Sequence, residues 1–104
     1  MTLPLFPTAA PEPERPHTCH ARGCSVPVPP ERLMCLDHWR RVPRAVQRAV
    51  WRAYRPGQCD DKRPSAEWFV AADAAIGYVS LRNGGRVTAS EAAALRRFGF
   101  EVPA

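Results

Sequence analysis

The chain has 104 residues, of which 45% are hydrophobic and 24% charged, and its formal net charge is +5. A chain of this length holds one small domain, because two separate cores would each be too small to be stable. No stretch approaches the roughly 18 apolar residues of a membrane span, and residues 1–7 are too short and Pro-rich for the apolar part of a signal peptide. We therefore expect a cytoplasmic protein without a membrane partner, whose cysteines are metal ligands rather than disulfide partners.

Residues 1–17 contain five prolines and few apolar side chains after Phe6. Such a composition buries too little apolar surface to fold, so we expect a disordered Pro-rich tail. The rest of the chain is predicted to divide into a metal-binding module with a basic helix, residues 18–58, and a linker with a helical extension packed on that module, residues 59–104. The predicted fold is therefore mostly α.

Four candidate metal ligands follow the tail at finger-like spacing, as Cys19-x4-Cys24 and Cys35-x2-His38. Gly23 permits the positive φ of a tight turn that folds two thiolates onto one ion. The Pro-rich segment 25–30 suits an extended return or an edge hairpin, and a helix that starts near Cys35 places Cys35 and His38 on one face. This order of elements predicts a treble-clef-like module. Three thiolates and an imidazole favour a four-coordinate structural zinc ion, which leaves no open position for catalysis.

Other assignments of the metal site stay open at this point. His17 or His20 can replace one of the cysteines, and Asp37 can support His38 from outside the ligand set. Cys59 lies beyond the next predicted helix and is expected to be a thiol without metal. The four candidate ligands can also be unrelated core residues, because their spacing is only moderately specific.

A basic helix is predicted next. The residue before a proline disfavours helix, so the helix begins at Pro43 and runs to about Tyr54, ahead of Pro56-Gly57. Residues 39–59 contain six arginines and no acidic residue, a local charge of +6 that leaves −1 for the rest of the chain. One arc of this helix collects the residues expected to contact nucleic acid: Arg44, Arg48, Trp51, Arg52 and Arg55.

Arginine pairs with phosphate and stacks on bases, and Trp51 can stack as well, so this arc favours nucleic-acid binding. The alternative is an ordinary solvent-exposed face, with Trp51 packed against the helix that contains Trp68. Lys62 is the one lysine of this chain, so nearly all of its basic residues are arginine. A GC-rich genome would produce such a composition without a functional cause.

Two further helices are predicted in the C-terminal half. Residues 59–64 form a charged linker, and Ser65 then caps a helix that runs to about Arg82 and ends at Asn83-Gly84-Gly85. The apolar face of this helix contains Trp68, Ala72, Ala75, Ile76 and Val79. The segment 88–91, Thr-Ala-Ser-Glu, is a capping box for a last helix that stops at Gly99.

No catalytic arrangement is predicted. Cys35 with His38, and Cys59 with Asp60, each lack an orienting third group. The paired His-Asn-His pattern of treble-clef nucleases is absent from the sequence. We therefore expect a binding protein rather than an enzyme, without a small-molecule substrate, and a nuclease is only a distant third alternative.

The stretch Met34-Cys35-Leu36-Asp37-His38-Trp39, together with Pro43, Trp51, residues 54–58 and residues 63–65, resembles small zinc-finger-like proteins of phages and prophages. The resemblance covers about residues 18–80 and implies that Cys19, Cys24, Cys35 and His38 hold zinc, in the cytoplasm of a bacterial host. The leading functional expectation is nucleic-acid binding through the arginine-rich helix. The alternative is a phage-encoded adaptor or inhibitor, of an anti-defence type, that binds a host protein complex.

Overall fold

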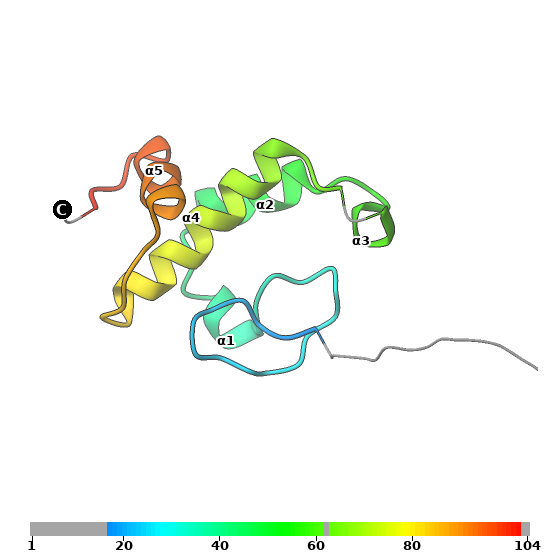
Figure 1. Ribbon diagram of the computed structural model, residues 1–104, viewed down its shortest axis with the longest axis horizontal. Helices are drawn as coiled ribbons and strands as arrows, with labels where there is room; N and C mark the ends of the chain where they lie inside the picture. The colour runs from blue at the N-terminus through cyan, green and yellow to red at the C-terminus, as the bar shows by residue number, and fades with distance from the viewer. Residues whose placement is uncertain (1–16, 62, 103–104) are drawn as a thin grey trace, which may run out of the picture.

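The computed structural model describes residues 17–61 and 63–102. The helices within these ranges are α1 (Leu36–Trp39), α2 (Arg44–Ala53), α3 (Gln58–Asp61), α4 (Ala66–Arg82) and α5 (Ala89–Arg97) (Figure 1). The described residues contain no β-strand, and a single antiparallel bridge pairs Thr18 with Pro27. The prediction of a mostly helical fold is thus confirmed. The predicted disordered tail lies outside the described residues, apart from His17.

Local capping explains where the two C-terminal helices begin and end. The Ser65 hydroxyl oxygen accepts a hydrogen bond from the Trp68 N–H at 3.1 Å, and α4 ends at Arg82, followed by its C-cap Asn83 and by Gly84 with φ +78°. The predicted capping box of α5 is present in full between Thr88 and Glu91. Both helices therefore match their sequence predictions, since each start needs only a side chain within reach of the first turn.

The segment between α2 and α4 corrects two predictions. Pro43 is the residue before α2 rather than its first residue, because its ψ of 144° is extended. The predicted linker at residues 59–64 contains most of the short helix α3. Gln58 starts this helix through two hydrogen bonds with the backbone of Arg55, one of which its own side chain accepts at 2.8 Å. Gln58 is only 4% exposed, so its amide is held by the fold and not by solvent.

Helix α4 is the centre of the packing, since it contacts both α2 and α5 (Figure 1). The core cluster joins these helices through Val46, Ala72, Ala74, Ala75, Val79 and Leu95, and it continues into the metal-binding region through Cys19, Ala21, Leu33, Met34 and Cys35. Small residues let the helices approach closely: a Cβ at Gly77 would lie 3.0 Å from the Glu91 Cβ. Of the predicted apolar face, Ala72, Ala75 and Val79 are buried, whereas Trp68 and Ile76 are half-buried against the same core.

Two polar contacts connect segments that are distant in the sequence. Arg22 forms an ion pair of 2.7 Å with Glu91, whose side chain is 7% exposed, so the turn between Cys19 and Cys24 is tied to α5. Ser65 donates its hydroxyl hydrogen to the Ala53 carbonyl while it caps α4, so one side chain joins the end of α2 to the start of α4. Across the described residues, no helix has both the length and the apolar character needed to cross a bilayer.

Candidate metal centre

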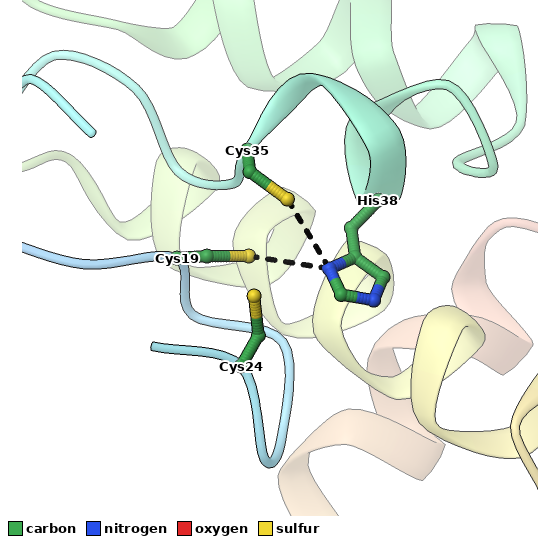
Figure 2. Close-up of side chains that lie close together, drawn as sticks. All are labelled: Cys19, Cys24, Cys35 and His38. Atoms are coloured by element: carbon green, nitrogen blue, oxygen red, sulfur yellow. Dashed lines mark hydrogen bonds between the residues drawn. The ribbon is translucent and has the colours of Figure 1, made fainter. Parts of the chain in front are cut away.

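The first pair of candidate ligands lies on a tight turn. Gly23 has φ +80°, as predicted, and the Cys24 N–H donates to the Ala21 carbonyl at 3.0 Å. The Ala21 N–H in turn lies 3.5 Å from the Cys19 sulfur, to which it donates. Only a residue that tolerates positive φ completes this turn without strain, which is why glycine follows Arg22. The turn therefore holds the Cys19 and Cys24 thiols on the same side of the chain (Figure 2).

The second pair lies at the start of α1. Cys35 is the N-cap of this helix, with extended backbone, and His38 is its third residue. The His38 Nδ1 atom lies 3.4 Å from the Cys35 sulfur and 3.5 Å from the Cys19 sulfur. The predicted common face of Cys35 and His38 is thus observed, and it points toward the turn that contains Cys19 (Figure 2).

The four ligand atoms lie close enough together to hold a metal ion. They all lie within 4.8 Å of one another. With metal–sulfur and metal–nitrogen bonds of about 2.3 and 2.0 Å, adjacent ligand atoms around a tetrahedral ion are separated by roughly 3.5 to 3.8 Å. The two recorded sulfur–nitrogen distances, 3.5 and 3.4 Å, agree with that range. The Cys3His group can therefore hold one metal ion with little rearrangement, and its composition is consistent with zinc.

Burial and backbone N–H groups shift the pKa values of the cysteines in opposite directions. Burial raises the pKa of the Cys19 thiol, an effect that the backbone N–H groups of Cys35 and Ala21 partly offset. The backbone N–H of His38 is the main reason why the pKa of Cys35 lies below its ordinary value. A metal ion binds thiolates and releases their protons. The Cys35 thiol therefore gives up its proton to a metal ion more readily than the Cys19 thiol.

The alternative ligands lie outside this group of four. His17 and His20 face each other, with 3.2 Å between their Nε2 atoms, and the His17 Nδ1 atom lies 3.3 Å from the Val28 carbonyl oxygen. Burial, and secondarily the charge of His17, lower the pKa of His20. Asp37 pairs with Arg41 at 3.4 Å on the exposed side of α1 and is not directed at the ligands. The Cys59 thiol lies 3.4 Å from the Tyr54 hydroxyl, also away from the metal group.

The end of α2 separates the residues that were predicted to bind nucleic acid into two groups. Arg44, Arg48 and Arg52 lie exposed on the helix, opposite the buried Val46 and Val50. In the part of the chain that the structure describes, the side chains of these three arginines make no hydrogen bond or ion pair. We name these residues the arginine face.

Arg55 does not belong to that face, which corrects the predicted arc. The helix ends at Ala53, and the next residue, Tyr54, is extended with ψ 124°. The Arg55 guanidinium donates to the Arg63 carbonyl at 2.8 Å, so it fastens the α3 segment instead of continuing α2. Arg55 directly precedes Pro56, a position that disfavours helix, and the contact with Arg63 then fixes its side chain.

A pocket beside the arginine face was not predicted. It has a volume of about 230 Å³, and Trp39, Trp51 and Trp68 all line it. Trp51 is 48% exposed and shares this pocket with Trp68, so the alternative that Trp51 packs against the helix of Trp68 stays open. The aromatic side chains come from three helices or helix ends, and a local periodicity cannot bring them together. Only the possible proximity of Trp51 and Trp68 had a signal in the sequence.

Comparisons of the chain with protein-family models, with curated proteins and with solved structures found no match.

Proposed function

We propose that the chain is a small structural-zinc protein that binds nucleic acid through the arginine face of α2. Zinc is supported by the ligand chemistry, since three cysteines and one histidine are a common set for a closed, four-coordinate structural site. Four protein ligands leave no position for a water molecule or substrate, so the ion supports the fold and does not catalyse a reaction. The role proposed for the protein is therefore binding.

We also assign the metal-binding region to a treble-clef-like arrangement. A turn supplies Cys19 and Cys24, the bridge between Thr18 and Pro27 returns the chain, and the start of α1 supplies Cys35 and His38. This order of turn, return and helix start is the one predicted from the sequence. The short length of α1 means that the helix mainly orients the last two ligands, while α2 carries the proposed binding surface.

The observation that carries the nucleic-acid proposal is the set of three exposed arginines on one helix. Arg44, Arg48 and Arg52 follow each other at intervals of four residues, over about 12 Å of helix axis at 1.5 Å per residue. No acidic residue occurs in α2, so no carboxylate of the helix itself competes with a phosphate for these guanidiniums. Arginine binds phosphate with paired hydrogen bonds, which makes such a row suitable for a nucleic-acid backbone.

The salt dependence of binding tests this proposal. For three phosphate contacts we expect a slope of log affinity against log salt of about −3 on duplex DNA and about −2 on single strands. The zinc-loaded protein is titrated into labelled oligonucleotides and binding is followed by fluorescence anisotropy. The double variant with Arg48→Ala and Arg52→Ala should weaken binding to all sequences and reduce the slope by about two units on duplex DNA. Absence of binding at low salt would refute the proposal.

A second candidate is an adaptor or inhibitor, phage-encoded and of an anti-defence type, that docks on a host protein complex. It is favoured by the exposure of two large apolar side chains that line one pocket, Leu36 at 56% and Trp51 at 48%. A pull-down from bacterial lysate, with and without nuclease, separates the candidates. A partner protein retained after nuclease treatment and lost in Leu36→Asp supports the adaptor, whereas one lost with nuclease was held through nucleic acid.

A further inference from the structure

We propose that the pocket lined by Trp39, Trp51 and Trp68 receives an unpaired nucleobase, so that the arginine face binds single strands in preference to duplexes. This inference rests on the proposed nucleic-acid function and specifies its ligand. We name the site the tryptophan pocket. The base would enter beside Trp51, whose indole is the most exposed of the three, while the sugar–phosphate backbone lies along α2.

The three tryptophans line one pocket without ring contacts to one another. Trp51 makes its ring contact with Tyr54, at 5.7 Å between centroids, and Trp68 makes its ring contact with Phe69, at 5.5 Å. Among the described rings, no contact joins any two of the three tryptophans, although all three line the same 230 Å³ pocket. Three tryptophans around one open volume suit a planar aromatic guest, and base–aromatic stacking accepts every base.

The polar groups of the pocket also suit a base. Across residues 17–61 and 63–102, no hydrogen bond involves the indole N–H of Trp39, Trp51 or Trp68. A half-buried indole N–H usually has a partner, and nucleobases offer acceptor atoms along their edges. Glu31 and Arg32 are the charged residues of the lining, with one charge of each sign, so they provide an acceptor and a donor without a net charge.

The position of Trp51 in α2 links the pocket to the arginine face. Arg48 precedes Trp51 by three residues and Arg52 follows it directly, so both lie within one helical turn of the indole. Phosphates held by these arginines would carry their bases past the mouth of the pocket. In a duplex each base is stacked and paired, and it reaches such a pocket only after it is unstacked, at a cost of a few kcal/mol per base. A single strand avoids that cost.

A second, larger hollow is less suitable. It has a volume of about 630 Å³ and lies between α2, the start of α4 and the end of α5. Ala49, Ala53, Ala66 and Val70 form much of its wall, and Phe98 is the one aromatic residue of its lining. Arg52 borders this hollow too, so it can assist phosphate binding, but a single phenylalanine offers a base less stacking surface than three tryptophans.

The test compares three ligands of equal length with the zinc-loaded full chain: oligo-dT, an abasic single strand and a duplex. We expect oligo-dT to bind more tightly than the abasic strand. Trp51→Ala should weaken oligo-dT binding about 5- to 150-fold, the range for one stacked base, and leave the abasic strand unchanged. Trp51→Phe should recover most of the loss, because phenylalanine also stacks. Val26→Ala is the control, since Val26 is also a large exposed hydrophobic residue, at 46%, and does not line the pocket.

The outcomes separate the inference from the function on which it rests. Equal binding of oligo-dT and the abasic strand, both lowered by Arg48→Ala but not by Trp51→Ala, would overturn the tryptophan pocket and keep the arginine face. Quenching of tryptophan fluorescence by oligo-dT but not by the abasic strand supports the pocket. No binding of any of the three ligands would refute both proposals, and the pocket would then be assigned to an apolar side chain of a protein partner.

Discussion

The ion pair between Arg22 and Glu91 predicts that the metal-binding turn and α5 lose stability together. The carboxylate of Glu91 is nearly buried, at 7% side-chain exposure, whereas the Arg22 side chain is 41% exposed. In Arg22→Met the carboxylate keeps its hydrogen bond from the Thr88 N–H but loses the charged donor at 2.7 Å. Methionine keeps most of the aliphatic stem, so the lost contact is mainly electrostatic.

The expected cost lies between the values for exposed and buried ion pairs. Exposed pairs contribute about 0 to 1 kcal/mol, and removal of one partner from a buried pair costs about 3 to 5 kcal/mol. One end of this pair is buried and the other is half-exposed, so we expect Arg22→Met to lower the free energy of unfolding by about 2 kcal/mol, close to the range for hydrogen bonds to charged groups. For a domain of this size that is a decrease in Tm of about 10 °C.

A double-mutant cycle with Glu91→Gln, followed by urea unfolding of the zinc-loaded protein, measures the pair itself. Glutamine keeps an oxygen for the capping hydrogen bond with Thr88, so mainly the charge is removed. We expect a coupling energy of about 1 to 2 kcal/mol between the two substitutions. Arg86→Met is the control, because Arg86 is exposed and has no ion pair among the described residues. A coupling below about 0.5 kcal/mol, the usual limit of additivity, would show that the reasoning is wrong.

Three further predictions concern the metal, a carboxyl group and a helix contact. Cys35→Ser should lose the metal and unfold the N-terminal region, because structural zinc contributes on the order of 10 kcal/mol to folding. Cys59→Ser should keep one zinc per chain by elemental analysis. An equal zinc content in the two variants would contradict the ligand set. Asp73→Asn should stabilise the protein at neutral pH, because burial, and secondarily the charge of Glu91, raise the pKa of Asp73. The gain in stability should shrink as the pH falls through that raised pKa. Unfolding measurements at two pH values check the sign of this change. Gly77→Ala should destabilise the protein by about 1 kcal/mol in thermal unfolding. Overpacking beside Glu91 at 3.0 Å costs about 1 to 3 kcal/mol, and the higher helix propensity of alanine offsets at most about 1 kcal/mol. A stabilised variant would show that α5 can move away.

Features that depend on neighbours in the sequence could be predicted. The positive φ of Gly23, the cap at Ser65 and the capping box at Thr88 each involve atoms within a few residues. The spacing of the cysteines and His38 likewise placed four ligand atoms close together, because a turn and a helix start have fixed local geometry. These are the parts of the fold and the site for which the sequence analysis and the structure agree.

Features that depend on distant residues could not be predicted. The burial of Gln58 arises from packing, and it helps to make α3 of a segment that looked like a linker. The contact of the Arg55 side chain with the Arg63 carbonyl likewise depends on how this segment folds back. The pair of Arg22 and Glu91 spans 69 residues of sequence, and the tryptophan pocket requires helix ends that meet only in the folded chain. No local pattern contains that information, because it arises from packing.

The double role of Ser65 has a consequence for the thermodynamics of any ligand in the tryptophan pocket. Its hydroxyl group donates to the Ala53 carbonyl and accepts from the Trp68 N–H. Ala53 lies two residues after Trp51, and the second partner is Trp68 itself. Two walls of the pocket are therefore held at a set separation before a guest arrives. Preorganisation of this kind removes part of the conformational entropy loss from the binding step and transfers it to folding. A guest would then show a smaller entropic penalty on binding than it would in a variant in which Ser65 is alanine, even though Ser65 never contacts the guest.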